Sequence, residues 1–129
     1  MERCGRQVLV VEDDICARDL LTQLLIRAGY EVREASNGVE ALHELVQQHY
    51  DLIITDYRMP GRINGLELMR LSRQVWPDTP VILVTGDSAS MLGPSGQGVG
   101  CAYIQKPYDA TYLLDTIQAV VGQGYVKSA

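Results

Sequence analysis

The chain has 129 residues, of which 47% are hydrophobic, and it carries a net charge of −5 at pH 7. This length and apolar content suit one buried core, so we expect a single domain over residues 1–129. The acidic balance gives no basic surface for a polyanion, and no apolar run is long enough to cross a membrane. We therefore expect a cytoplasmic protein that contacts neither nucleic acid nor a membrane directly.

Short apolar runs alternate with stretches of helical periodicity from the start of the chain. A strand is predicted over residues 8–11, and Gly29 is placed to end the helix that follows it. The apolar positions of that helix recur three or four residues apart, at Ala17, Leu20, Leu21, Leu24, Leu25 and Ala28. A second strand over residues 31–35 leads to a second helix with Asn37 as its N-cap. Its apolar face comprises Gly38, Ala41, Leu42, Leu45 and Val46.

A third strand and a third helix follow. Residues 52–55 are apolar on both faces and rich in β-branched side chains, as a central parallel strand must be. Asn64 and Glu67 form a capping-box pattern that predicts a helix start. That helix carries Leu68, Leu71 and Val75 on one side and ends at Trp76-Pro77.

Two more strands are predicted, over residues 81–84 and 102–105. Asp109 is suited to cap a last helix. The apolar face of this helix comprises Leu113, Ile117, Val120 and Val121. Residues 122–129 are interpreted as a tail or the start of a linker.

The stretch between these two strands, residues 86–101, contains five glycines and a proline. Each interior glycine costs a helix about 1 kcal/mol relative to alanine. We therefore expect an atypical or degraded helix here instead of a regular one.

The alternation of strands and helices predicts an α/β fold with a parallel sheet. In an open parallel sheet, ligands bind at the edge where the carboxyl ends of the strands meet. Polar residues follow four of the predicted strands at this edge: Glu12 and Asp13, Asp56, Thr85, and Lys106. The sequence therefore predicts that residues far apart in the chain form one site.

Three carboxylates in one crevice, those of Glu12, Asp13 and Asp56, require a proton or a cation. Two unit charges about 4 Å apart repel by about 4 kcal/mol at an effective dielectric constant of about 20. An all-oxygen set of ligands suits Mg²⁺ or Mn²⁺. Once Lys106 and a cation neutralise incoming oxygens, the Asp56 carboxylate can act as a nucleophile toward a phosphoryl group, to which Thr85 can donate its hydroxyl.

Four segments resemble motifs of the response-regulator receiver family. They are V-L-V-V-E-D-D at residues 8–14, D-L-I-I-T-D-Y-R-M-P at 51–60, P-V-I-L-V-T-G at 80–86 and Y-I-Q-K-P at 103–107. Their order and spacing cover nearly the whole chain. The resemblance implies a flavodoxin-like, three-layer, doubly wound fold whose five parallel strands have the spatial order 2-1-3-4-5.

The resemblance also implies a phosphoacceptor and a metal site. Asp56 corresponds to the phosphoacceptor. Asp13 corresponds to a direct Mg²⁺ ligand, and Glu12 to an acid that reaches the ion through water. The backbone carbonyl of Arg58 corresponds to a further ligand.

Three more residues take roles by the same resemblance. Thr85 and Lys106 correspond to the hydroxyl and the amine that hold the phosphoryl group. Tyr103 corresponds to the aromatic residue whose rotamer reports the phosphorylated state. The Lys106-Pro107 bond corresponds to a cis peptide.

The implied function is a phosphorylation-dependent signalling switch. It receives its phosphoryl group from a histidine kinase or a histidine phosphotransfer protein, and it acts on a downstream protein or a fused output domain. We expect no enzymatic activity beyond autophosphorylation and autodephosphorylation. A homodimer is compatible with this function.

Two features depart from the family pattern. Four residues lie between Pro60 and Gly65 where the family has three, and residues 86–101 do not resemble the helix that the family has there. The first departure affects the loop near the Arg58 carbonyl, and the second affects the usual output surface.

Two other functions remain as alternatives. A receiver-like adaptor that is no longer phosphorylated would not need the full set of site residues. A Mg²⁺-dependent phosphatase with an aspartyl nucleophile commonly has a second aspartate two residues after the first, and this chain has Arg58 there.

Overall fold

Five parallel strands form one sheet in a computed structural model that describes residues 6–59, 61–86 and 101–128, with the backbone alone at 101 and 122–128. The strands are β1 (Gln7–Val11), β2 (Glu31–Ala35), β3 (Leu52–Asp56), β4 (Val81–Thr85) and β5 (Cys101–Gln105). The helices of the described residues are α1 (Ile15–Arg27), α2 (Gly38–Gln47), α3 (Gly65–Val75) and α4 (Ala110–Ser128).

The spatial order of the strands is β2-β1-β3-β4-β5, which confirms the predicted order. Each neighbouring pair is parallel, and the register aligns Val11 with Thr55 and Asp56 with Val84. The strand order reverses between β1 and β3, since the chain first runs outward to β2 and then returns past β1. A parallel sheet opens its ligand crevice beside such a reversal.

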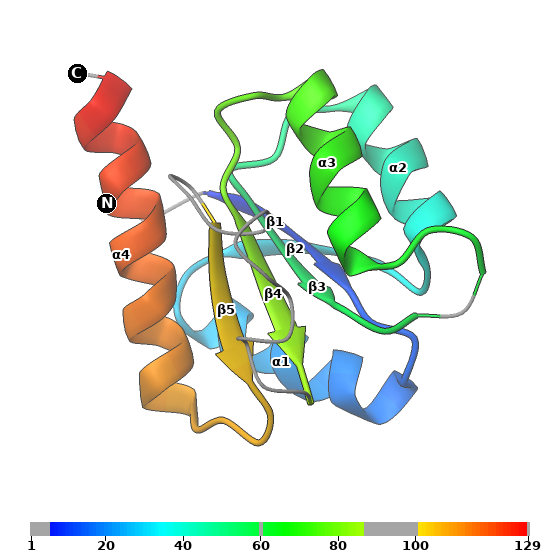
Figure 1. Cartoon of the computed structure of the whole chain (residues 1–129). Helices are drawn as coiled ribbons and strands as arrows, with labels where there is room; N and C mark the ends of the chain where they lie inside the picture. The colour runs from blue at the N-terminus through cyan, green and yellow to red at the C-terminus, as the bar shows by residue number, and fades with distance from the viewer. Residues whose placement is uncertain (1–5, 60, 87–100, 129) are drawn as a thin grey trace.

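Helices cover both faces of this sheet, so the molecule has three layers (Figure 1). On one face, Leu21 and Leu25 of α1 and Ile117 of α4 join the core formed by alternate residues of the central strands. On the other face, Leu45 of α2 and Leu68 of α3 pack against the intervening strand residues. Because both faces are covered, β3 and β4 are buried along their whole length, which explains their continuous apolar sequences.

The predicted helix starts are confirmed by their hydrogen bonds. The side chain of Asn37 accepts from the Glu40 N–H, and that of Asn64 accepts from the Glu67 N–H. Each side chain satisfies one of the N–H groups that a helix start leaves without an intrahelical partner. At the end of α1, Gly29 has a φ of 100°, a left-handed conformation that glycine adopts without steric cost.

The predicted apolar faces are wider than the buried ones. Leu20 of α1 is 73% exposed, while its neighbour Leu21 is buried. Val46 of α2 is likewise exposed, and Leu45 is buried. A helix advances by 100° per residue, and the flat sheet covers only the part of the helix that faces it, so side chains at the rim of an apolar stripe stay in solvent.

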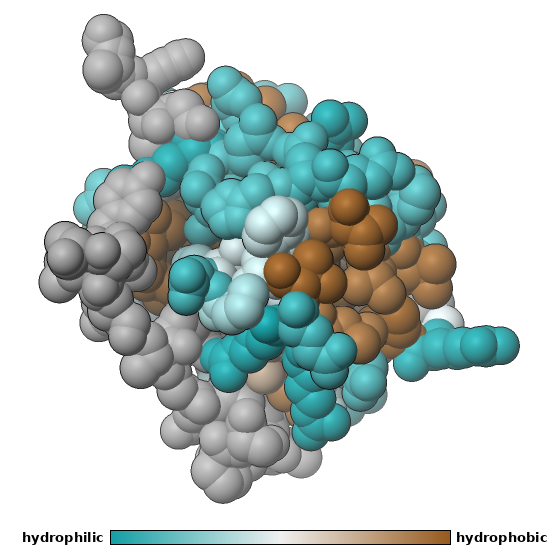
Figure 2. All heavy atoms as spheres, turned by 90° about the horizontal axis from the view of Figure 1, so that it is seen from above, coloured by the Kyte–Doolittle hydropathy of each residue, from teal (hydrophilic) through white to brown (hydrophobic). Residues whose placement is uncertain are grey.

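Apolar side chains therefore contribute to the surface. The large exposed ones are Ile15, Leu20, Ile26, Val39, Val46 and Tyr112. Figure 2 shows one face of the molecule, on which hydrophobic side chains gather in one region among hydrophilic ones.

Two expectations from the sequence concern residues 122–129 and residues 86–101. Helix α4 continues to Ser128, through residues that we interpreted as a tail. The prediction of an atypical helix over residues 86–101 falls almost wholly on 87–100, which lie outside the described residues. Among the helices of residues 6–59, 61–86 and 101–128, none combines the length and the apolar character needed to cross a membrane.

Candidate functional site

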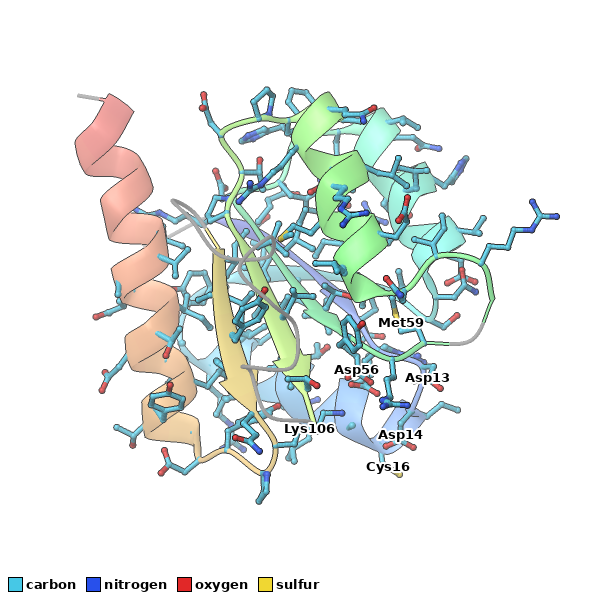
Figure 3. All side chains as sticks on the ribbon, in the orientation of Figure 1. Asp13, Asp14, Cys16, Asp56, Met59 and Lys106 are labelled. Carbon is cyan, nitrogen blue, oxygen red and sulfur yellow. The ribbon has the colours of Figure 1, made fainter. Side chains whose placement is uncertain are left out.

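The carboxyl ends of three strands bring four of the predicted polar residues to one edge of the sheet. Glu12 and Asp13 follow β1, Asp56 is the last residue of β3, and Lys106 follows β5. Figure 3 shows Asp13, Asp56 and Lys106 gathered at this edge. The structure therefore brings together side chains that are up to 94 positions apart (106 − 12).

Three carboxylates meet here. Oxygen atoms of Glu12, Asp13 and Asp56 all lie within 4.8 Å of one another. Glu12 and Asp56 are buried, whereas Asp13 is exposed. The site, called the crevice below, is thus an acidic cluster with two buried members and one exposed member.

The Lys106 amine lies between the two buried acids. Its Nζ is 3.4 Å from Asp56 Oδ1 and 3.6 Å from Glu12 Oε1. Its backbone N–H donates to the Thr85 carbonyl at 2.8 Å, and the Lys106-Pro107 peptide bond is cis, as the resemblance implied. One positive charge is therefore shared by two carboxylates.

The electrostatics of the crevice favour proton uptake by its acids. Burial raises the pKa of Asp56, and Lys106 only partly opposes this effect. Burial and the nearby Asp56 raise the pKa of Glu12. Burial opposes the charge of Lys106, but Asp56 and Glu12 hold the pKa of its amine above the ordinary value. The negative charge of the crevice exceeds what one lysine compensates.

The backbone around Glu12 is held on both sides. Its N–H donates to the Ala35 carbonyl of β2 at 3.1 Å, and its own carbonyl accepts from Arg18 Nη1 at 2.8 Å. Its carboxylate accepts from the Asp14 N–H at 3.2 Å. Asp14 in turn caps α1 by accepting from the Ala17 N–H, which agrees with its position at the helix start.

The end of β3 is fixed by its neighbours. The Tyr57 N–H donates to the Val84 carbonyl at 2.8 Å, and the Tyr57 carbonyl accepts from the Gly65 N–H at 2.9 Å. A Cβ at Gly65 would collide with the Asp56 carbonyl oxygen and lie 2.8 Å from the Tyr57 Cα. Only glycine lets the start of α3 approach the strand this closely.

The remaining predicted residues lie around this centre. Thr85 is buried at the end of β4 and pairs in register with Gln105. Tyr103 lies on β5 opposite Leu83, and it packs on the core face covered by α2 and α3. Arg58 lies two residues beyond Asp56, in the loop after β3, and is exposed.

Sequence reasoning missed two residues that contact the site. Gly65 was used only to delimit a loop, and Arg18 was not considered. A signal for Arg18 was present, because a cation in the first turn of a helix faces the positive end of the helix dipole and needs another reason to be there. The close approach at Gly65 has no signal in the local sequence.

The residues present fit a small divalent cation. Carboxylate oxygens are the ligands that Mg²⁺ prefers, and it uses few of them while retaining water. The exposed Asp13 leaves one side of the crevice open to solvent, and the two buried acids carry charge that Lys106 does not balance.

Comparisons with known proteins agree with this geometry. A family model described as the response regulator receiver domain matches residues 8–118. The response regulator receiver protein CpdR of Brucella abortus is 31% identical over 117 residues, which cover 90% of this chain and 97% of that protein. A probable transcriptional regulator of Pyropia yezoensis, ycf29, is 33% identical over 95% of this chain, but the chain spans only 56% of its length.

A solved structure is similar over most of its length. The response regulator protein TrrA of Thermotoga maritima, crystallised in complex with Mg(2+)-BeF, has a TM-score of 0.80 and 34% sequence identity. The match covers 89% of this chain and 98% of that one.

Proposed function

This chain belongs to the response-regulator receiver family, and on that premise we propose that it is a phosphorylation switch whose phosphoacceptor is Asp56 and whose cofactor is Mg²⁺. Receiver domains are signalling domains that interact with histidine kinases and with output domains. In this proposal, the phosphoryl donor is a histidine kinase or a histidine phosphotransfer protein.

The observation that carries the proposal is the position of the Lys106 amine. It lies 3.4 Å from Asp56 Oδ1, and two further carboxylates, those of Glu12 and Asp13, lie beside Asp56. An amine at this distance can contact both the acceptor carboxylate and an oxygen of an incoming phosphoryl group. A structural ion pair alone would not need two more acids beside it.

The chemistry follows from these positions. An oxygen of the Asp56 carboxylate forms a bond to phosphorus while the bond from phosphorus to the donor nitrogen breaks, and the electron pair leaves with the donor imidazole. Lys106 stabilises negative charge on the transferred oxygens, and the Thr85 hydroxyl donates to one of them. When bound, Mg²⁺ neutralises charge on the carboxylates and on the phosphoryl oxygens.

The acids have separate tasks in this proposal. Asp13 and Asp56 hold the cation directly together with the Arg58 carbonyl, and Glu12 holds it through water. Glu12 also keeps Lys106 in place, since its Oε1 lies 3.6 Å from the amine. Tyr103 and Thr85 stand on the same face of neighbouring strands, an arrangement that suits them to report the phosphorylated state together.

Intact-mass spectrometry tests the proposal. The protein is treated with a small phosphodonor such as acetyl phosphate, with Mg²⁺ or with EDTA. We expect one added phosphoryl group that depends on Mg²⁺ and is absent from Asp56→Asn, whereas Asp51→Asn, at the start of the same strand region, keeps it. Equal labelling of Asp56→Asn would refute the acceptor assignment, and no labelling of the wild type by any donor would favour an adaptor.

A further inference from the structure

Arg18 makes a contact that the proposed chemistry does not use. It lies in the first turn of α1, and its side chain is only 18% exposed. A positive charge at this end of a helix is unfavourable, because it faces the positive end of the helix dipole. The contacts of the guanidinium group must therefore compensate for its position.

The guanidinium group bridges two elements. Nη1 donates to the Glu12 carbonyl at 2.8 Å, and Nε lies 3.6 Å from Glu34 Oε1 on β2. The other carboxylate oxygen of Glu34 accepts from the Thr22 hydroxyl at 2.6 Å. Thr22 belongs to α1, so the chain of contacts from Thr22 through Glu34 and Arg18 to Glu12 connects the helix, β2 and the loop after β1.

The bonded carbonyl belongs to the peptide that joins Glu12 to Asp13. A peptide group is planar, so a hydrogen bond that holds the Glu12 carbonyl also fixes the position of the Asp13 Cα in the same plane. The Glu12 N–H is held by Ala35 on the other side. The two acids that follow β1 therefore take their orientation from a peptide that is held by a charged donor, and such hydrogen bonds are stronger than neutral ones.

We propose that Arg18 is a positioning residue that sets the affinity of the crevice for a divalent cation by fixing the Glu12-Asp13 peptide. This inference rests on the proposed function, because it needs the cation to bind at these acids. Arg18 touches neither the cation nor the phosphoryl group. It acts through the backbone, and Glu34 and Thr22 hold it in place.

The sign of the effect separates positioning from simple charge. Arg18 is a cation near an acidic site, so by Coulomb attraction alone its removal would make the crevice more negative and tighten Mg²⁺ binding. If Arg18 positions the acids, its removal weakens binding. Substitutions of residues that orient metal ligands typically reduce metal affinity by 10-fold or more, so we expect a loss on the order of 10-fold in Arg18→Ala.

A titration of the metal-free full chain with MgCl₂, followed by the amide shifts of Asp13 and Asp14 in NMR spectra, measures this affinity. Arg27→Ala is the matched control, since it removes the same charge from the same helix at its far end. We expect the control to bind Mg²⁺ as the wild type does. Arg18→Lys keeps the charge but lacks the fork that reaches both Glu12 and Glu34, so it should bind Mg²⁺ more weakly than the wild type and more tightly than Arg18→Ala.

Thr22→Val provides a test without a change of charge. It removes the hydroxyl that holds Glu34, and it should weaken Mg²⁺ binding by a smaller factor than Arg18→Ala. If Arg18→Ala does not fold, Thr22→Val and Arg18→Lys decide the question alone.

Mg²⁺ binding in Arg18→Ala that is unchanged or tighter overturns the inference. If Arg18→Ala is unfolded, unchanged or tighter binding in both Thr22→Val and Arg18→Lys overturns it. Either result leaves the proposed function intact. A wild type that shows no Mg²⁺-dependent shift at Asp13 overturns both. Weaker binding in the variants with an unchanged control supports the positioning role.

Discussion

At the scale of single residues, the distinctive feature is the cost of keeping Asp56 charged. The side chain is buried, and burial together with the nearby Asp13 raises its pKa although the Lys106 amine lowers it. Such an acid binds protons more tightly in the folded chain than in the unfolded one. The free energy of unfolding therefore falls as pH rises from the ordinary pKa to the raised one. Above the raised pKa, the full loss of stability caused by the charged Asp56 is present.

Asp56→Asn should consequently stabilise the metal-free protein at neutral pH, because it removes this charge while keeping the shape of the side chain. The melting temperature in EDTA should be higher than that of the wild type at pH 7. The difference should shrink as pH falls through the window between the raised and the ordinary pKa, since Asp56 then becomes neutral in the wild type too.

Asp115→Asn on the exposed side of α4 is the matched control, and it should change the melting temperature little at either pH. A lower melting temperature for Asp56→Asn than for the wild type at pH 7 would mean that the pair with Lys106 outweighs the cost of burial.

At the scale of elements, the site depends on how closely α3 approaches the end of β3. The contact is made at Gly65, where an added Cβ would collide with the Asp56 carbonyl and approach Leu83 Cδ2 to 2.9 Å. The neighbouring atoms are backbone and a packed core side chain, so they cannot move away freely. The first turn of α3 and the loop from Tyr57 must therefore shift together if this position carries a side chain.

Gly65→Ala should destabilise the protein by about 1–3 kcal/mol, the usual cost of overpacking. Urea denaturation of the metal-free protein measures the change. Gly86→Ala is a suitable control, because a Cβ there meets no atom of residues 6–59, 61–86 and 101–128 within 4 Å and the residue follows the neighbouring strand. Equal midpoints for the two variants would show that α3 yields without cost.

At the scale of the whole molecule, cation binding and folding are linked. The acids at the end of β1 and at the end of β3 come together only in the folded sheet, so a cation that binds them stabilises the folded state alone. The expected stabilisation is about 2.7 kcal/mol when free Mg²⁺ is 100 times the dissociation constant.

The melting temperature should therefore rise with MgCl₂ concentration, measured against NaCl at equal ionic strength because salt also screens the acidic repulsion. Asp13→Ala should lose most of the response, while Asp19→Ala, which removes an exposed acid of α1, should keep it. An undiminished response in Asp13→Ala would exclude Asp13 as a ligand.

The sequence by itself indicated the α/β fold, and it predicted that Glu12, Asp13, Asp56 and Lys106 lie at one edge of the sheet. Alternating apolar runs and helical periodicity specify strands and helices locally, and the capping residues Asn37 and Asn64 mark helix starts through bonds within a single turn. The polar residues Glu12, Asp56 and Lys106 could be assigned to one site because the carboxyl ends of parallel strands necessarily share an edge.

Only the tertiary structure decided how these parts meet. Periodicity shows which side of a helix is apolar but not how much of its circumference the sheet covers. It therefore did not separate exposed Leu20 from buried Leu21. The bond from Arg18 to the Glu12 carbonyl and the close approach at Gly65 depend on the separation of a helix from a strand, a distance set by side chains throughout the core. Such distances depend on the packing of the whole chain, so no local pattern of residues specifies them.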